Sequence, residues 1–211
     1  MNRPNSSTTP RVRTAGETSD PKQERAIRTR GAILVAAAEL FAEHGFPDVT
    51  IKNVADRAEL TKGAIYFHFA NKEALAVAVT DHFYRRLGAV VRAAHEGNEA
   101  SPAVVRDLFL QVATAFRDDL IVQAGTRLQL ERSYIKAPLP TPYTEFTELI
   151  SELLTECRDS GTLPETVDPA ALARVLRSAL FGAQHISWVS EGRSDIVERV
   201  QEITEALLPA T

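Results

Sequence analysis

The sequence predicts an all-α protein in which small helices come first and longer helices follow. From Lys22 onward, apolar residues recur at the three- and four-residue spacing of one helix face. Alternation of the kind that marks β-strands is absent, and no internal repeat is visible. Turn-forming residues separate the helical stretches, as in "APLPTP" at 137–142 and "DSGTLPETVDP" at 159–169.

The first twenty-one residues precede this pattern. They are rich in Ser, Thr, Pro and Asn and contain few large apolar side chains, so they cannot bury enough surface to offset the entropy of ordering. We expect a disordered tail over residues 1–21. The remainder is predicted to form a small domain of residues 22–70 and a larger domain of residues 71–211.

The small domain is predicted to begin with a helix whose apolar positions include Ile33 and Phe41 and which stops at Gly45. Thr50 can cap a short second helix, and Thr61 a third that ends near Phe67. A long helix follows from Asn71 to Leu87. Five further helices are expected near residues 102–118, 120–135, 143–160, 168–190 and 194–208.

Composition narrows the class of protein. No apolar run approaches the roughly 20 residues that a membrane span requires, and no signal peptide is visible near the start. The single cysteine, Cys157, excludes an intrachain disulfide framework and a clustered-cysteine metal site. We therefore expect a cytoplasmic protein with no membrane partner, no metal and no cofactor.

The net charge of −4 is distributed unevenly. Residues 1–86 contain 13 Lys+Arg and 10 Asp+Glu, a balance of +3, whereas residues 87–211 contain 11 and 18, a balance of −7. This asymmetry favours an N-terminal part that meets a polyanion while the rest of the chain stays soluble.

Two short helices joined by a tight turn, Ile51–Ala58 and Thr61–Phe67 around Glu59 and Leu60, describe a helix-turn-helix unit. The second helix of such a unit lies in the major groove of DNA. The stretch "LTKGAIYFHFANKEAL", residues 60–75, contains Gly63 inside the predicted third helix. A glycine inside a helix lowers helix stability by about 1 kcal/mol relative to alanine. That cost is tolerable if a bare backbone lets the helix approach the duplex closely.

The neighbouring side chains fit the same role. Lys62 and Lys72 stand as cations at the two edges, and Tyr66 and His68 can donate to phosphate oxygens. Three apolar side chains are expected to anchor the helix inward: Ile65, Phe67 and Phe69. The alternative is a short aromatic-rich helix that only fills a core, and spacing alone does not separate the two.

The motif "TIKNVADRAELTKGAIYFHFANKEAL", preceded by "ILVAAAELFAEHGFPDV", resembles the DNA-binding domain of the TetR family of bacterial repressors over residues 28–75. The resemblance implies a homodimer that binds double-stranded, near-palindromic operator DNA through two recognition helices. It also implies a rear domain for an effector. The implied DNA contacts are Thr50, Lys52, Thr61, Lys62, Gly63, Ala64, Tyr66, His68 and Lys72. The family usually has glycine where this chain has Glu59. If the turn requires a positive φ there, a non-glycine residue costs about 1 kcal/mol, and we expect a slightly altered turn.

The rear domain has a second resemblance. "QERAIRTR" and "QAGTRLQLERSYIKAPLPTPYTEF" resemble the hormone receptors that control antibiotic production in filamentous soil bacteria. These TetR-type proteins release DNA when they bind a small diffusible signalling molecule: a γ-butyrolactone, a butenolide or an alkyl furan carboxylic acid. In that group a tryptophan commonly lines the pocket where this chain has Phe146.

The candidate ligand contacts combine apolar bodies with polar tips, as a pocket for such a molecule requires. They are Tyr84, Gln129, Tyr143, Phe146 and Trp188. For each polar group the alternative is a hydrogen bond within the protein. His185 and Trp188 face the pocket, the dimer seam or the core, and Arg127 pairs either with a ligand carboxylate or with a protein group.

Apolar stripes on the last two helices predict the dimer seam, with internal packing as the alternative. Their members are Leu172, Leu176, Leu180, Ile196, Val200, Ile203 and Leu207.

Two rival functions remain at this stage. An enzyme is disfavoured because the five histidines show no HExxH spacing and no GxSxG motif is present. A TetR-type repressor of an efflux pump, responding to drugs or other lipophilic compounds, would share the front domain and differ only in what the rear domain binds.

Overall fold

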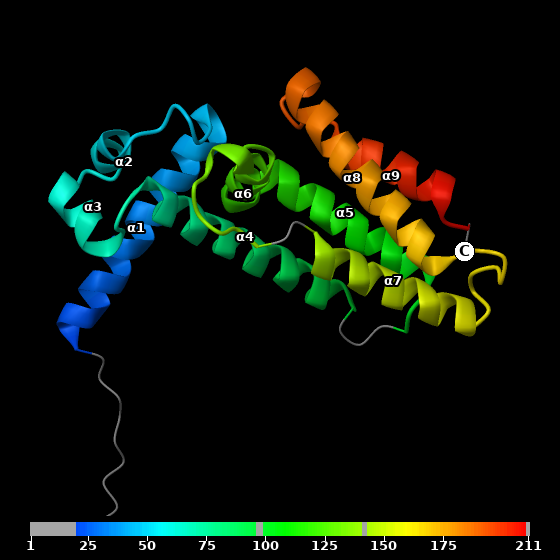
Figure 1. Ribbon diagram of the computed structural model, residues 1–211. Coiled ribbons are helices and arrows are strands. Elements are labelled where there is room, and N and C mark those ends of the chain that lie inside the picture. Colours follow the sequence, from blue (N-terminus) through cyan, green and yellow to red (C-terminus); the bar gives the residue numbers. More distant parts are fainter. Residues whose placement is uncertain (1–19, 96–98, 141–142, 210–211) are drawn as a thin grey trace, which may run out of the picture.

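A computed structural model describes residues 20–95, 99–140 and 143–209, and every regular element in these ranges is helical (Figure 1). The all-α prediction is confirmed; most of the predicted tail, residues 1–19, lies outside the described ranges. The elements are α1 Pro21–His44, α2 Ile51–Arg57, α3 Lys62–His68, α4 Lys72–His95, α5 Pro102–Asp118, α6 Leu120–Leu130, the 3-10 helix η1 Arg132–Tyr134, α7 Thr144–Asp159, α8 Pro169–Glu191 and α9 Ile196–Leu207.

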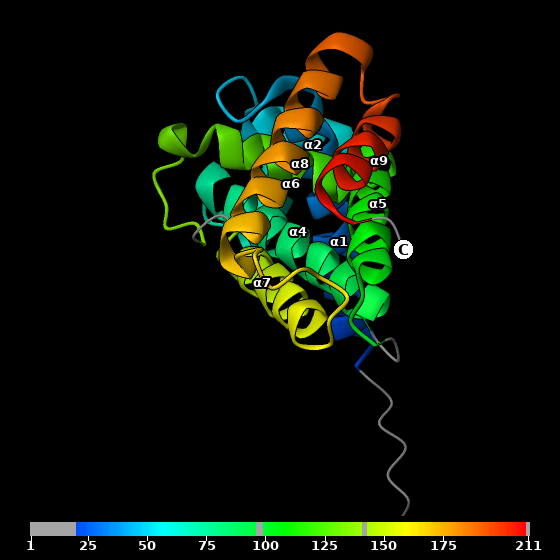
Figure 2. The same ribbon diagram turned by 90° about the vertical axis from the view of Figure 1, so that its right-hand side faces the viewer.

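The helices form two groups that share α4 and α6. At one end, α2 and α3 pack with α1 into a small body, and α4 leaves this body to run along the rest of the molecule (Figure 1). At the other end α5, α7, α8 and α9 form a bundle, in which α8 lies beside both α7 and α9 (Figure 2). α6 packs against both α1 and α4, so it lies at the junction of the two groups.

Each group has its own hydrophobic core. The front core is built largely from small side chains of α1, such as Ala37 and Ala38, around the larger Ile33, Phe41 and Ile65. The rear core is richer in aromatic and long aliphatic side chains from α4, α5, α7 and α8. The close approach of α4 and α6 depends on Gly125, because a Cβ atom there would overlap the Phe83 side chain.

Local signals place the first helices as expected. Gly45 ends α1 at φ 82°, and Thr50 forms a capping box in which its N–H donates to Asn53 Oδ1 at 2.9 Å. Thr61 Oγ1 accepts a hydrogen bond from the Ala64 N–H at 3.2 Å at the start of α3. These bonds satisfy N–H groups that the first helical turns leave without a backbone partner.

The turn between α2 and α3 has Glu59 at φ 54°, so this residue does take the left-handed conformation that favours glycine. The Leu60 N–H donates to Ala55 O at 2.9 Å and the Glu59 N–H to Asp56 O at 3.3 Å. This pair of bonds is the Schellman arrangement, which normally has glycine at the left-handed position. The turn therefore keeps its usual hydrogen bonds despite the bulkier residue.

Three expectations are corrected. α4 continues eight residues past Leu87, because Leu87 and Val91 extend its buried face onto the rear core. The helix expected over 120–135 ends at Leu130, where the Glu131 side chain turns to accept a hydrogen bond from the Phe46 N–H. Phe67 is 81% exposed rather than an inward anchor, because Ile65 and Phe69 already fill the space beneath α3.

The predicted dimer stripes are also corrected. Leu176, Leu180, Ile196 and Val200 are fully buried within the single chain, where α8 and α9 pack on each other and on α5. The alternative of internal packing is therefore the one observed for these residues. Of the predicted stripe Leu207 is 37% exposed, and three apolar side chains of α8 that were not in the predicted set are exposed with it: Val175, Ile186 and Val189.

Candidate nucleic-acid interface and ligand cavity

The outer face of α3 is a convex surface of unusual composition. Tyr66 is 54% exposed and Phe67 81%, next to exposed Lys62 and Gly63. Ile65, between them in sequence, is fully buried and fixes the helix on the front core. A short helix that is held on one side and offers aromatic, cationic and bare-backbone surface on the other suits insertion into a DNA groove.

Gly63 has no role within the chain that another residue could not take. A Cβ atom built there would approach only Thr61 Oγ1, at 3.8 Å, which is ordinary contact. Glycine in a helix interior is less favourable than alanine by about 1 kcal/mol. The absence of a side chain at this position is therefore best explained by a partner that approaches α3 from outside.

The side chains predicted to contact DNA differ in whether they already interact with other residues of the chain. Lys62 is exposed and forms no ion pair with the part of the chain that the structure describes, whereas the Lys52 amine lies 2.7 Å from Asp56 on α2. The Lys72 amine donates to Phe46 O at 2.7 Å and lies 4.1 Å from the centre of the Phe46 ring. Burial lowers the Lys72 pKa below its usual value. Lys72 therefore acts within the chain, holding the loop between α1 and α2.

The remaining predicted contacts lie at the base of the same surface. Thr50 and Thr61 are exposed N-caps, and their hydroxyls are engaged with the helices they begin. Ala64 and His68 are half-buried, with the His68 ring edge-on to Phe67 at 5.0 Å between centres. α2 is secured to α1 by Arg57, whose guanidinium lies 2.9 Å from Glu39. This carboxylate and Glu43 raise the Arg57 pKa.

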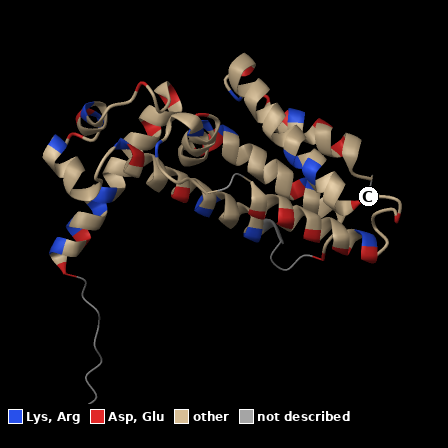
Figure 3. Ribbon diagram, viewed as in Figure 1, with Lys and Arg blue, Asp and Glu red and all other residues tan. Residues whose placement is uncertain are grey.

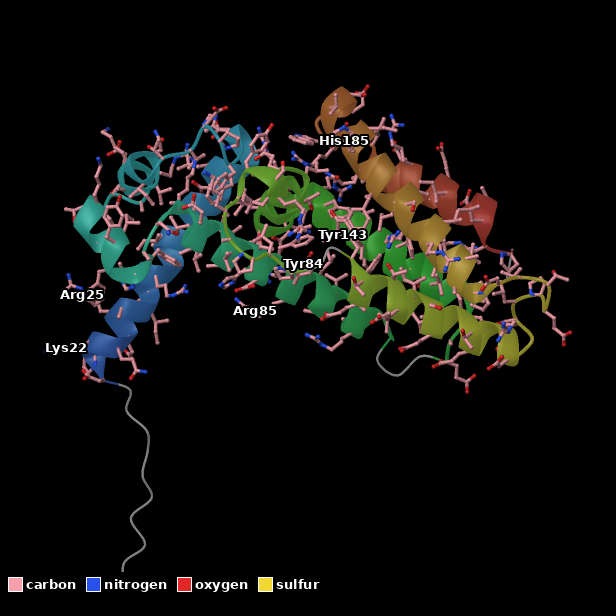
Figure 4. All side chains as sticks on the ribbon, viewed as in Figure 1. Lys22, Arg25, Tyr84, Arg85, Tyr143 and His185 are labelled. Carbon is pink, nitrogen blue, oxygen red and sulfur yellow. The ribbon has the colours of Figure 1, made fainter. Side chains whose placement is uncertain are left out.

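Sequence reasoning missed a further set of cations. Lys22, Arg25 and Arg28 are exposed on the first turns of α1, which project beyond the front core (Figure 3). Figure 4 shows Lys22 and Arg25 on this projecting end, on the same side of the molecule as α3. Their three-residue spacing in "KQERAIR" was the signal that could have identified them, since it places cations on adjacent turns of one helix.

A cavity of about 850 Å³ lies between α4 and the start of α7. Its volume lies within the range of small-molecule sites. Its lining residues are Asp81, Tyr84, Arg85, Leu87, Gly88, Val91, Arg92, Pro140, Tyr143, Thr144, Glu145, Phe146 and Leu149. Three of the five predicted ligand contacts, Tyr84, Tyr143 and Phe146, line this one cavity.

The two tyrosines bring hydroxyl donors to the cavity from different helices (Figure 4). The Tyr84 hydroxyl is buried and lies beside the Tyr143 main chain without a hydrogen bond of good geometry. Burial raises the Tyr84 pKa and raises that of Tyr143 to about 12, so both stay protonated at neutral pH. The Tyr143 ring packs against Phe181 in a tilted arrangement, with 3.8 Å between ring centres, and its backbone is left-handed, with φ 63°.

Gln129 lies behind the cavity wall rather than in its lining. Arg132 donates to Gln129 Oε1 at 3.3 Å and to Pro140 O at 3.5 Å, and Pro140 borders the cavity. Among residues 20–95, 99–140 and 143–209, Gln129 Nε2 is buried with no hydrogen-bond partner, as is Thr80 Oγ1, one turn before Tyr84. Buried polar atoms without partners are uncommon and call for a specific explanation, of which a ligand or a water molecule is one. Thr80 and Arg132 were not identified from the sequence.

Trp188 lies outside the cavity lining. Its ring is flanked by Arg127, whose guanidinium carbon is 5.3 Å from the ring centre, and by Arg193 at 5.1 Å. The exposed His185 lies one turn earlier on α8 (Figure 4), with its ring 6.1 Å from that of Trp188. Arg127 also forms an ion pair with Glu131 at 3.0 Å. Of the two partners considered for Arg127, a ligand carboxylate or a protein group, the structure therefore shows a protein group.

Within the described residues, no helix combines the length and the apolar character that crossing a membrane would need. Residues 33–79 match the sequence family described as bacterial regulatory proteins, tetR family. Residues 100–210 match the tetracyclin repressor-like C-terminal domain.

Individual relatives extend this comparison. The A-factor receptor protein of Streptomyces griseus is 32% identical over 189 residues, which are 90% of this chain and 66% of that protein. A solved structure that addresses the control of antibiotic production by bacterial hormones is 45% identical, with a TM-score of 0.77, covering 86% of this chain and 96% of the other. A gamma-butyrolactone receptor structure is 28% identical, with a TM-score of 0.67 over 87% of this chain and all of the other.

Proposed function

Because the chain belongs to the TetR family of bacterial regulatory proteins, we propose that it is a transcriptional repressor released from DNA by a small signalling molecule. In this proposal residues 22–70 bind the operator, residues 71–211 bind the effector and dimerise, and the protein acts in the cytoplasm without catalysing a reaction. The effector is a γ-butyrolactone, a butenolide or an alkyl furan carboxylic acid, and the genes controlled serve antibiotic production.

One observation carries the proposal: α4 joins the two candidate sites. Near its start, Lys72 holds the loop that precedes α2 through the bond to Phe46 O. Three turns later, Tyr84 presents a buried, unpartnered hydroxyl at the cavity. A molecule that binds Tyr84 therefore acts on the helix that positions the DNA-binding body, which is what coupling between two sites requires.

The chemistry of the cavity favours a particular kind of effector. Tyr84 and Tyr143 supply protonated hydroxyls, which donate to an acceptor such as a carbonyl or carboxylate oxygen. Leu87, Val91 and Leu149 supply an apolar wall beyond them. An oxygen-rich head with an alkyl tail satisfies both parts. The relatives named for hormone and gamma-butyrolactone recognition support the same class.

Two copies of the chain are required for a near-palindromic site. We assign the contact between them to the exposed apolar surface of α8 and α9. Val175, Ile186 and Val189 stand on one side of α8, and each is at least half exposed in the single chain. Burying such a stripe against its own copy is the common route to a symmetric dimer.

The proposal is tested with purified protein and the DNA upstream of its own gene, at a fixed salt concentration. Binding is followed by gel shift, and panels of γ-butyrolactones, butenolides and alkyl furan carboxylic acids are then titrated in. We expect tight binding that one of the three classes reverses. Failure to bind any DNA would contradict the repressor proposal itself.

The same experiment separates the alternative function. If the protein binds DNA tightly and only drug-like lipophilic compounds release it, the protein is a repressor of an efflux pump and its rear domain binds drugs. Tyr84→Phe then distinguishes recognition through the tyrosine hydroxyl from general lipophilicity, because only a ligand that accepts that hydrogen bond loses affinity.

A further inference from the structure

The junction between α1, α6 and α8 contains a group of contacts that neither the interface nor the cavity uses. The Arg127 guanidinium, on α6, donates to Ala42 O at 3.0 Å and to Glu43 O at 2.9 Å. Both carbonyls belong to the last turn of α1, where backbone acceptors lack a partner within the helix. A cation at this end is favourable because it also meets the negative end of the helix dipole.

Glu131 holds the next residues of the same corner. Its carboxylate pairs with Arg127 at 3.0 Å and accepts a hydrogen bond from the Phe46 N–H at 2.5 Å. The corner has no space for larger groups, since a Cβ atom on Gly45 would clash with both side chains. Arg127 and Glu131 are each about four-fifths buried, so this ion pair is shielded from salt and holds a defined geometry.

Trp188 extends these contacts to α8. The guanidinium carbons of Arg127 and Arg193 lie 5.3 and 5.1 Å from the centre of its ring. Arg193 follows α8 in a left-handed conformation with φ 76°, and its Nε is buried without a partner. Two like charges are held close together here because an aromatic face attracts both. Trp188 therefore links the end of α8 to the corner that ends α1.

We propose that Trp188 and Arg127 are positioning residues, which fix the DNA-binding body relative to α8 and thereby set the separation of the two recognition helices in the homodimer. α8 carries the exposed apolar stripe assigned to the dimer contact, and α1 carries α2 and α3. A direct link between α8 and the end of α1 thus defines how far apart the two α3 helices stand. This inference rests on the proposed function.

The test measures how strongly the affinity for operator DNA depends on the spacing between its two half-sites. Wild-type protein first selects its preferred site from random double-stranded DNA, and the site is then rebuilt with one or two base pairs inserted at its centre. Each inserted pair moves the half-sites apart by about 3.4 Å and rotates one relative to the other. Affinities for the three sites are measured by fluorescence anisotropy for wild type, Trp188→Leu, Trp188→Phe and Tyr134→Leu.

We expect wild type to lose at least about tenfold in affinity for each inserted pair. Trp188→Leu removes the aromatic face but keeps apolar bulk, so it should bind the original site about tenfold more weakly and lose less than about threefold per insertion. Trp188→Phe keeps a ring and should restore the steep spacing preference. Tyr134→Leu makes the same kind of change at a 63% exposed position outside the corner and the dimer stripe, so it should behave as wild type.

A role in stability alone would lower all affinities together and leave the spacing preference steep, so that outcome overturns the inference. Sedimentation and circular dichroism confirm that each variant is a folded dimer. If Trp188→Leu does not fold, Arg193→Gln provides the same test, because it removes one cation and keeps the ring. Wild-type protein that selects no DNA sequence would instead overturn the proposed function, and the inference with it.

Discussion

The two ends of the molecule place their polar chemistry in opposite directions. In the front body the polar groups that lead into α2 and α3 are satisfied by caps and ion pairs, and the unpaired Lys62 and the tyrosine of α3 point to solvent. In the rear body the unpartnered groups Thr80 Oγ1, Tyr84 Oη and Gln129 Nε2 are buried around or behind a cavity. The comparison teaches that the front is built for a large partner outside and the rear for a small one inside.

The largest expected effect comes from removing the outward chemistry of α3. The double variant Lys62→Ala, Tyr66→Ala should weaken operator binding about a hundredfold, because two contacts of about 1–3 kcal/mol each are lost. The slope of log affinity against log salt should also fall by about one, since one cation is removed. Anisotropy titrations at four salt concentrations measure both, with Lys136→Ala, an exposed lysine outside α1, α2 and α3, as the control.

The buried polar groups at the rear cavity predict the opposite pattern, in which ligand binding and stability change and operator binding does not. Tyr84→Phe removes a buried hydroxyl that has no partner, so the protein without ligand should be more stable by about 1 kcal/mol. Effector affinity should fall about tenfold while operator affinity is unchanged. Urea unfolding and release titrations measure these effects. Tyr134→Phe, at a 63% exposed position, should change neither; a loss of stability in Tyr84→Phe would show that the hydroxyl already serves the fold.

Gly63→Ala sharpens the contrast within the front body. The substitution should raise the free energy of unfolding by up to about 1 kcal/mol, because alanine favours the helix and meets no internal obstacle. Operator affinity should nevertheless fall. Gly31→Ala on α1, where a Cβ also has open space, should give the same stabilisation with operator affinity intact. Equal operator binding by both variants would remove the argument for close approach at Gly63.

The smallest effect is a pH dependence from His82. Burial, followed by the nearby charges of Arg85 and Arg30, lowers the His82 pKa below its usual 6.5. The unfolded chain therefore binds the proton more readily than the folded one, and stability should fall as the pH drops below about 6.5. Unfolding at pH 7.5 and at pH 5.5 should show a smaller difference for His82→Gln than for wild type.

Local signals explain why much of the fold could be predicted. Thr50, Thr61 and Gly45 act within one or two turns of their own position, so their helix ends were predictable from the chain. Phe67 was misplaced because an aromatic residue reads as core in a sequence, and only the packing of Ile65 beneath α3 shows that the space is already filled. Most residues of the predicted dimer stripes were misassigned because a helix face that packs within the chain and one that packs against a second copy have the same apolar pattern in the sequence.

The site was predictable to a similar extent. Tyr84, Tyr143 and Phe146 were grouped correctly in one cavity by resemblance and residue type. Trp188 and Lys72 are engaged elsewhere, through contacts with residues more than twenty positions away in the chain. Such contacts depend on how α1, α6 and α8 meet, which no local pattern in the sequence specifies.

The measurement that tests the central claim most directly is the affinity of wild-type protein for the releasing ligand, determined by calorimetry with and without saturating operator DNA. If one chain couples the two sites through α4, DNA must weaken ligand binding by the same factor by which the ligand weakens DNA binding. We predict equal factors of about five- to 150-fold. A ligand that binds with the same affinity in the presence and absence of DNA would contradict the account.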